Sequence, residues 1–141
     1  MTHLPSSLNL KKSLGQHFLK DEAICRQIVD ALLVNPFTQL LEIGPGAGAL
    51  TKYLIEIKHI DFKAVEIDAQ KAAYLRSTYP ALIPELIEAD FLRMNSPFEG
   101  RFTVIGNFPY NISTQILFKI LDWREGVERV IGMFQKEVAQ R

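Results

Sequence analysis

The segment Leu40-Leu41-Glu42-Ile43-Gly44-Pro45-Gly46-Ala47-Gly48 places a short apolar run directly before a turn rich in glycine. An apolar run of this length, bounded by glycine and proline, is typical of a buried strand, and the glycines let the chain turn sharply after it. The following residues, 49–57, carry Leu50, Leu54 and Ile57 on one side of an expected helix. The segment therefore predicts a buried strand, a tight turn and a helix.

The rest of the chain repeats this alternation of strands and helices. Apolar, β-prone runs predict further strands at 62–67, 86–90, 102–106 and 127–134. Helices are expected between and after them, at 21–34, 68–78, 112–123 and 135–141. Strands that alternate with helices form a parallel sheet through right-handed crossovers, with helices on both faces. The predicted fold class is α/β, with residues 1–20 as an amino-terminal arm and 21–141 as one domain.

The first helix is expected to begin after Asp21, a good N-cap residue, and to bury one face. The apolar residues that recur at helical spacing on that face are Ile24, Ile28, Ala31 and Leu32. Cys25 lies near the same face and is expected to pack there. Because it is the sole cysteine, no internal disulfide can form, and no metal site is predicted.

Composition narrows the class of protein. Of the 141 residues 48% are hydrophobic, which is enough for a core. No apolar run reaches the roughly 18 to 20 residues of a membrane span. The amino terminus lacks the basic and apolar regions of a signal peptide, so a cytoplasmic soluble protein is expected. The 16 basic and 16 acidic residues balance, so composition alone gives no support for nucleic-acid binding.

The glycine turn and the carboxylate that ends the next strand predict a ligand that contains ribose. Gly44, Gly46 and Gly48 allow a ligand to approach the backbone, where a side chain would collide with it. Glu66 follows about twenty residues later, at the end of the next strand, where a carboxylate can accept both ribose hydroxyls. The alternative is a turn that uses glycine only for tight packing.

Two ribose-containing ligands fit this pattern. The turn also satisfies the looser dinucleotide fingerprint, so NAD is a rival. Asp90 ends the third predicted strand, where it could accept a hydrogen bond from an adenine amino group. No residue stands out as an acid for hydride transfer, and S-adenosylmethionine, which has no pyrophosphate, depends on carboxylates and backbone groups. We therefore favour S-adenosylmethionine as the cofactor.

The segment Gly106-Asn107-Phe108-Pro109-Tyr110 ends the fourth predicted strand and carries groups suited to a planar base with an exocyclic amine. The side-chain oxygen of Asn107 and the carbonyl of Pro109 can each accept one N–H bond from that amine. Such acceptors aim the nitrogen lone pair at a methyl group and stabilise the positive charge that develops. Tyr110 can stack on the base, and Phe134 can form the second wall. The alternative is an ordinary turn, in which Asn and Pro are common.

Four motifs in register resemble one family. They are Gly15-Gln16-His17-Phe18-Leu19, Glu42-Ile43-Gly44-Pro45-Gly46, Gly106-Asn107-Phe108-Pro109-Tyr110-Asn111-Ile112-Ser113 and Phe134-Gln135-Lys136-Glu137-Val138-Ala139. In this order and spacing the chain resembles the ribosomal RNA adenine dimethyltransferases, and among them the bacterial small-subunit branch. The resemblance implies a Rossmann-like class I S-adenosylmethionine-dependent methyltransferase fold. It also implies truncation after the fifth strand, since the family continues with two strands and a helical domain that helps engage RNA.

The resemblance also implies a role for each site residue. Backbone atoms of His17 and Leu19 would line the cofactor site, and Gly44 would lie against the methionine part of the cofactor. Glu66 would bind the ribose hydroxyls and Asp90 the adenine amine, while Asn107 would contact the methionine end. Asn107 would contact the target amine as well. The family commonly has Leu where this chain has Phe108, and we expect that change to leave the chemistry unaltered.

The implied activity is dimethylation of the N6 amine of two adjacent adenosines in small-subunit (16S) ribosomal RNA, during ribosome biogenesis. The implied partners are that RNA and the immature small ribosomal subunit, with no membrane. Two alternatives stay open: a large-subunit RNA adenine methylase of the antibiotic-resistance type, and a non-catalytic RNA-binding or assembly factor on the same fold. Gly15-Gln16-His17 and Gly106 favour the small-subunit enzyme, and Asn107 with Tyr110 favours retained chemistry. An NAD oxidoreductase is the remote option.

Overall fold

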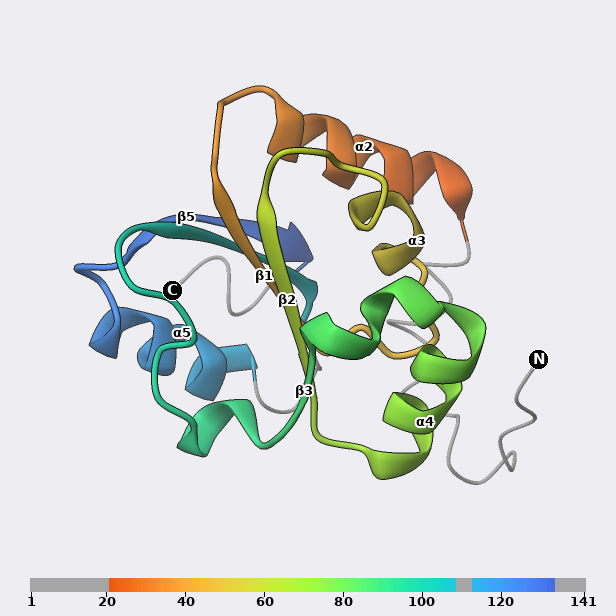
Figure 1. Ribbon diagram of the computed structural model, residues 1–141. Helices are drawn as coiled ribbons and strands as arrows, with labels where there is room; N and C mark the ends of the chain where they lie inside the picture. The colour runs from red at the N-terminus through yellow and green to blue at the C-terminus, as the bar shows by residue number, and fades with distance from the viewer. Residues whose placement is uncertain (1–20, 109–112, 134–141) are drawn as a thin grey trace.

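The computed structural model describes residues 21–108 and 113–133, which form one sheet with helices on both of its faces (Figure 1). The strands of these residues are, in chain order, β1 (Gln39–Ile43), β2 (Asp61–Glu66), β3 (Leu86–Glu88), β4 (Phe102–Asn107) and β5 (Val127–Met133). Their spatial order is β3-β2-β1-β4-β5, and every neighbouring pair is parallel. The predicted α/β class with a parallel sheet is confirmed.

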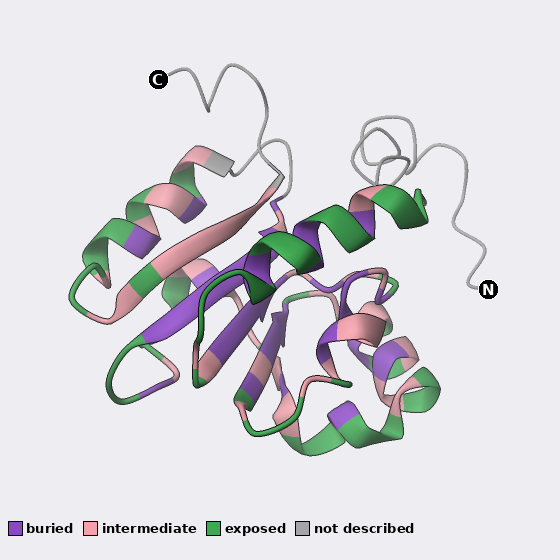
Figure 2. Cartoon of the chain, turned by 90° about the horizontal axis from the view of Figure 1, so that it is seen from above, coloured by how far each residue is buried: buried purple, intermediate pink, exposed green. Residues whose placement is uncertain are grey.

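Helices form a layer on each side of the sheet. One layer holds α2 (Glu22–Leu33), α3 (Thr51–Leu54), α4 (Ala69–Thr78) and the 3₁₀ helix η1 (Pro80–Glu85), and the other holds the 3₁₀ helix η2 (Phe91–Arg93) and α5 (Ser113–Asp122). In the part of the chain that the structure describes, no helix has the length and apolar character needed to cross a membrane. The strands lie between the layers, and Figure 2 shows β1, β2 and β4 largely buried, whereas β5 is mostly at intermediate exposure.

Consecutive residues of β1 are buried in different cores. Leu40 packs with α2, α3 and α4, whereas Leu41 packs with α5 and η2, and neither has exposed surface. Successive side chains of a strand point to opposite faces, so a strand that is covered on both sides is mostly apolar on both faces. This double burial explains why the apolar residues of β1 are consecutive rather than alternating, with Glu42 as the exception.

Helix α2 is rotated slightly from the expected orientation. The Asp21 carboxylate caps it as predicted, accepting a hydrogen bond from the Ala23 amide at 2.9 Å. The prediction was correct for Ile28 and Leu32 and wrong for Ala31, which is exposed. The buried residues are Cys25, Ile28, Val29 and Leu32, which are spaced i, i+3, i+4 and i+7. That stripe is the narrow one expected of a helix packed on a flat sheet, and it leaves Ala31 toward solvent.

The chain after the glycine turn is less helical than expected. The α-helical part is only Thr51–Leu54, whereas a helix was predicted over 49–57. The amides of Glu56 and Ile57 bond to carbonyls three residues earlier rather than four. Such bonds tighten the backbone into 3₁₀-type turns, which ends the α-helix early.

Candidate functional site

The carboxyl ends of the central strands meet at one edge of the sheet. Ile43 of β1 lies opposite Val65 of β2 and Gly106 of β4. In the sheet, β2 and then β3 lie on one side of β1, and β4 and then β5 lie on the other. Ligands of open α/β sheets bind where the strand order reverses, which here is between β1 and β4. Gly44 follows β1 and Asn107 ends β4, so the two segments singled out from the sequence flank this point.

The turn after β1 has a backbone that favours glycine at alternate positions. Gly44, Gly46 and Gly48 have φ angles of +66°, +59° and +88°, in the left-handed region. A β-carbon added to Gly44 would meet no heavy atom of residues 21–108 or 113–133 within 4 Å, so among the described residues the backbone there faces open space. At Gly48 the added carbon would lie 2.7 Å from the Tyr79 ring. The start of the turn is therefore accessible to a ligand, and its end is packed.

Glu66 joins the end of β2 to this turn. Its Oε1 accepts a hydrogen bond from the Gly46 amide at 3.1 Å, and its Oε2 accepts one from the Asp68 amide at 3.0 Å. The residue is only 5% exposed. Each carboxylate oxygen has two lone pairs, so one acceptor position stays available on each. Two such positions are what the two hydroxyls of a ribose require, so the geometry fits the predicted ligand class.

Glu42 is a second carboxyl group beneath the turn, and sequence reasoning did not single it out. It is 2% exposed, and its Oε1 accepts a hydrogen bond from the Thr51 hydroxyl at 2.6 Å. The pKa of Glu42 is raised to about 8, mainly because burial disfavours the charged form. The Thr51 hydrogen bond lowers the pKa, and the nearby negative charge of Glu66 raises it, and both effects are included in this value. The signal in the sequence that could have identified Glu42 was its position as an acidic residue among the apolar residues of the first predicted strand. Glu42 and Thr51 link the strand before the turn to the helix after it.

Asp90 lies beyond the end of β3, which stops at Glu88 rather than at Asp90 as predicted. Its Oδ1 accepts a hydrogen bond from the Leu92 amide at 3.0 Å, and this caps η2. Its Oδ2 lies 3.7 Å from Nε of Arg93. The cap turns the chain out of the sheet, so β3 is short, while the partly exposed carboxylate keeps free acceptor positions.

Ile67 is an apolar residue at the same edge that the sequence analysis did not single out as part of a site. It directly follows Glu66 and is 64% exposed. Apolar side chains this exposed beside a buried carboxylate offer contact area to the flat part of a ligand. In the sequence Ile67 was noted only as the last residue of the predicted strand 62–67, and its position directly after Glu66 was the available signal.

The predicted base-binding segment is only partly within the described residues. Asn107 is half-buried at the end of β4, and Phe108 is buried against the layer that contains α5. The remaining site residues proposed from sequence, His17, Leu19, Pro109, Tyr110 and Phe134, lie outside the described residues. The structure therefore brings the glycine turn, Glu66 and Asn107 to one edge of the sheet.

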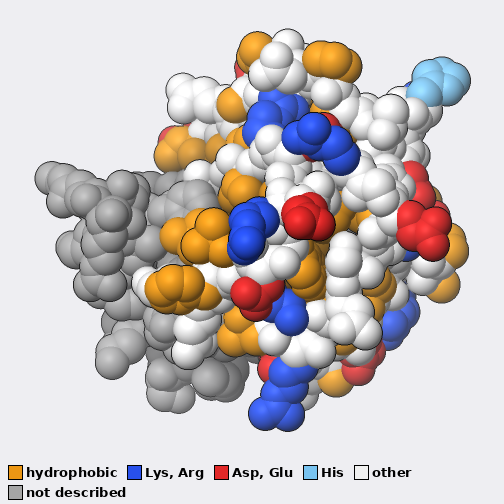
Figure 3. Space-filling view, turned by 90° about the vertical axis from the view of Figure 1, so that its left-hand side faces the viewer, with side chains coloured by type: hydrophobic (Ala, Val, Ile, Leu, Met, Phe, Trp, Pro, Cys, Tyr) orange, Lys and Arg blue, Asp and Glu red, His pale blue; other side chains and the backbone are white. Residues whose placement is uncertain are grey.

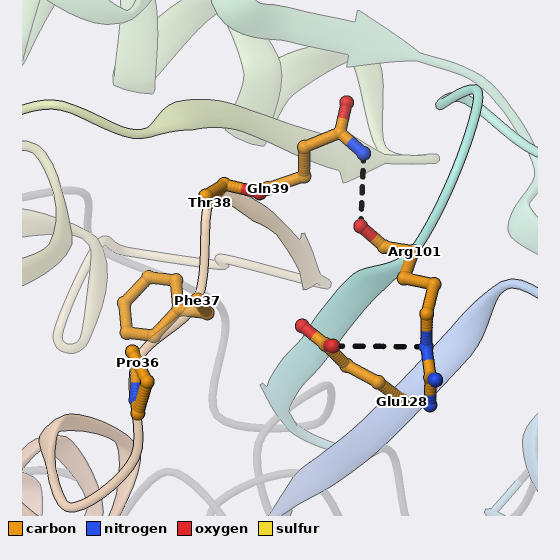
Figure 4. Close-up of a pocket in the computed structure, with 6 residues that line it drawn as sticks. All are labelled: Pro36, Phe37, Thr38, Gln39, Arg101 and Glu128. Atoms are coloured by element: carbon orange, nitrogen blue, oxygen red, sulfur yellow. Dashed lines mark hydrogen bonds and ion pairs between the residues drawn. The ribbon is translucent and has the colours of Figure 1, made fainter.

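A separate hollow of about 310 Å³ lies at the opposite edge, where the strands begin (Figure 4). Its lining residues are Pro36, Phe37, Thr38, Gln39, Arg101 and Glu128. The polar groups drawn there are engaged with each other: the Gln39 amide donates to the Arg101 carbonyl at 2.9 Å, and Arg101 lies 3.8 Å from Glu128. We therefore assign the candidate site to the carboxyl edge and not to this hollow.

Two proteins with similar sequences are named ribosomal RNA small subunit methyltransferase A. The Ribosomal RNA small subunit methyltransferase A of Cytophaga hutchinsonii is 49% identical over 134 residues, which cover 93% of this chain and 52% of that protein. The protein of the same name from Flavobacterium johnsoniae is also 49% identical over 134 residues, covering 93% of this chain and 51% of that protein. The chain thus spans about half the length of the curated relatives it matches.

Solved structures with a similar fold include two methyltransferases. The 23S rRNA methyltransferase ErmE has a TM-score of 0.74 and 30% identity, covering 87% of this chain and 50% of that one. A dimethyladenosine transferase from Plasmodium falciparum has a TM-score of 0.67 and 28% identity, covering 84% and 43%. The class I methyltransferase fold implied by the sequence is confirmed. The family described as ribosomal RNA adenine dimethylase matches residues 7–141, so the chain belongs to that family.

Proposed function

We propose that this chain forms the cofactor-binding part of an S-adenosylmethionine-dependent methyltransferase. The proposed reaction is dimethylation of the N6 amine of two adjacent adenosines in small-subunit (16S) ribosomal RNA. The observation that carries the proposal is the buried Glu66 carboxylate, hydrogen-bonded at 3.1 Å to the amide of Gly46 in a turn whose first glycine faces open space. Family membership supports the choice of a methyl donor over NAD.

The chain's own groups are assigned to the donor as follows. The two available lone pairs of Glu66 accept the ribose hydroxyls, and Asp90 accepts from the adenine amine. The backbone at Gly44 and Gly46 contacts the methionine part, because no side chain stands in its way. When bound, S-adenosylmethionine supplies an activated methyl group on its sulfonium. Backbone atoms of His17 and Leu19, outside the described residues, complete the proposed set, and the exposed Ile67 offers an apolar surface beside the ribose.

The target amine is assigned to the end of β4. The side-chain oxygen of Asn107 and the carbonyl of Pro109 each accept an N–H bond from it, which directs its lone pair away from the base plane. Two acceptor dipoles also stabilise the positive charge that builds on nitrogen, and by analogy with other preorganised sites each contributes about 2 to 4 kcal/mol. The methylated amine is acidic enough to release its proton to water, so no strong base is needed.

The base itself is assigned to aromatic side chains. Tyr110 stacks on one face of the adenine and Phe134 closes the other, and stacking of this kind contributes about 1 to 3 kcal/mol per base. The adenosine must be unpaired or flipped out of a helix for its amine to reach Asn107. These two rings lie outside the described residues, so their assignment depends on the family motifs alone.

Small-subunit RNA, within an immature small ribosomal subunit, is the proposed substrate because the relatives at 49% identity carry that name. A large-subunit RNA is the second candidate, favoured by the fold similarity to the 23S enzyme ErmE. On the side of the molecule drawn in Figure 3, basic and acidic side chains are intermixed rather than segregated. RNA engagement is proposed to depend mainly on the half of the relatives that this chain does not match. A cytoplasmic location is part of the same proposal.

Calorimetry with S-adenosylmethionine and with NAD tests the cofactor assignment. We expect S-adenosylmethionine to bind, and Glu66→Ala to weaken it by at least about tenfold, the loss expected for one or two hydrogen bonds. Glu88→Ala is the matched control, because Glu88 lies opposite Glu66 in β3 and points its carboxylate at Arg76 on the surface. Binding of NAD without S-adenosylmethionine would show that the proposal is wrong.

The two substrates are separated by extending the chain with the carboxyl-terminal half of a relative and incubating it with S-adenosylmethionine and unmethylated 16S or 23S RNA. We expect mass spectrometry of nuclease digests to find dimethyladenosine in the 16S RNA. Dimethyladenosine in the 23S RNA alone would favour the second candidate. Donor binding without methyl transfer to either RNA would favour a non-catalytic factor that keeps the cofactor fold.

A further inference from the structure

Two glycines face each other across β4 and β5 at the carboxyl edge. Gly106 of β4 and Gly132 of β5 are partners in the strand register. A β-carbon added to Gly132 would lie 2.1 Å from the Gly106 carbonyl oxygen and 2.6 Å from Cε2 of Phe108. Real β-carbons do not approach other atoms so closely, so a larger residue at 132 would have to displace backbone, the aromatic ring, or both. The strands are therefore in close contact at this point.

The ring of Phe108 lies over both glycines. Its Cε2 faces Gly132, and its Cε1 would be 3.4 Å from a β-carbon on Gly106. The residue is 5% exposed and belongs to the core cluster that includes Ile43 and Ile116. In the described part of the chain β5 is an edge strand, and an aromatic ring on a neighbouring strand can cover the bare backbone of an edge glycine.

We propose that Phe108 and Gly132 form a size-matched pair that positions Asn107. Asn107 is the residue immediately before Phe108, and its register partner, Met133, immediately follows Gly132. Successive side chains of a strand point to opposite faces, so seating the ring on one face sets the direction of the Asn107 amide on the other. Phe108 and Gly132 are positioning residues in this scheme. The inference rests on the proposed function for the importance of Asn107, but the pairing itself can be tested without the cofactor.

The pair makes the identity of residue 108 more important than its apolar character alone suggests. A leucine at 108 would keep the residue apolar, but its side chain is shorter than a phenyl ring and would leave Gly132 uncovered. The end of β4 would then lose the contact that orients it. The proposed pairing predicts that leucine at 108 disturbs Asn107, in contrast to the sequence-based expectation that this change leaves the chemistry unaltered.

Nuclear magnetic resonance of the 141-residue chain tests the positioning. The side-chain amide resonances of Asn107 are identified by their loss in Asn107→Ala, and then followed in Phe108→Leu, Gly132→Ala and the double variant. We expect both single variants to shift these resonances and to lower the melting temperature. The two losses in melting temperature should combine less than additively, because the ring is the shared partner.

The control is Phe98→Leu, a substitution of a buried phenylalanine in the same core cluster. Phe98 packs on Phe102, at the start of β4, with ring centroids 5.3 Å apart. It should lower the melting temperature without moving the Asn107 resonances. A purely structural role for Phe108 predicts that Gly132→Ala, which keeps the ring, also lowers the melting temperature without moving the Asn107 resonances, and that outcome would overturn the pairing.

Donor affinity separates this inference from the proposed function. If the unsubstituted chain binds S-adenosylmethionine, Phe108→Leu should weaken binding by about tenfold, equivalent to one lost hydrogen bond, and Phe98→Leu should not. If the unsubstituted chain binds no donor while the Asn107 resonances move as expected, the pairing stands and the proposed function fails. Unmoved resonances in a chain that does bind the donor would remove the pairing and leave the function.

Discussion

The Thr51 hydroxyl donates a 2.6 Å hydrogen bond to Oε1 of Glu42, and both residues are sealed from solvent. Glu42 precedes the glycine turn and Thr51 begins α3 after it, so the bond holds the two ends of the turn together. A buried carboxyl group is far cheaper to keep neutral than charged, which is why burial raises its pKa to about 8. The turn therefore rests on a protonated acid at neutral pH.

Glu42 should make the stability of the protein fall as pH rises. Its pKa is about 8 when folded and 4.5 ordinarily, so between these values the folded state holds a proton that the unfolded state has lost. The stabilisation is complete below pH 4.5 and declines by up to about 1.4 kcal/mol per pH unit until pH 8. We expect Glu42→Gln to flatten this decline, as measured by urea denaturation at several pH values. Glu88→Gln, on the surface, should leave the slope of the unsubstituted protein unchanged.

Gly48→Ala should destabilise the fold more than the same change at another left-handed glycine. Gly100 has a similar φ of +77°. A β-carbon added to Gly100 would lie 3.8 Å from the nearest described atom, Nε2 of Gln39, which is an ordinary contact distance. Gly100→Ala should therefore cost only the backbone strain, about 1 to 2 kcal/mol. At Gly48 the new methyl group would also strike the Tyr79 ring, at 2.7 Å. Urea denaturation should show the larger loss for Gly48→Ala. The excess should vanish in a Tyr79→Ala background, and its persistence there would exclude the ring as the cause.

Gly44→Ala should separate stability from donor binding. The added methyl group meets no atom in the part of the chain that the structure describes, so the loss of stability should match that of Gly100→Ala, about 1 to 2 kcal/mol. The same methyl group projects into the space assigned to the methionine part of the donor, so calorimetry should show S-adenosylmethionine binding largely lost. Gly100→Ala, at the opposite edge of the sheet, should bind normally. Equal donor affinity in the two variants would contradict the assignment of Gly44.

Arg129→Ala should weaken the attachment of α2 to the sheet. One guanidinium nitrogen of Arg129, in β5, donates to the Leu32 carbonyl at 2.7 Å and to the Asn35 carbonyl at 3.4 Å. These carbonyls lie at and just after the carboxyl end of α2, where a positive charge is favourable. We expect a loss of about 1 to 2 kcal/mol in the free energy of unfolding. Arg124→Ala, which removes only a contact of an exposed arginine to the nearby Leu121 carbonyl, should have little effect.

The α/β class, the order of elements and the spacing between the glycine turn and Glu66 followed from local pattern. The continuous apolar run Leu40-Leu41 indicated a strand that is covered on both faces, and the structure places these residues in two different cores. The Asp21 cap was likewise correct, because capping depends on residues two or three positions away. The prediction of the buried face of α2 was only partly correct, because helical spacing from Ile28 and Leu32 is compatible with either Ala31 or Val29 on the same face, and packing on the sheet buries Val29.

The sequence by itself determined the ends of the strands to within two residues, because glycine, proline and capping acids act over a few positions. Only the tertiary structure decided which of those ends meet. The bond of Glu42 to Thr51, the link of Glu66 to Gly46, and the close contact of Gly106 with Gly132 all depend on how separate segments pack. Packing of this kind is set by shape and burial in three dimensions, and no local periodicity records it.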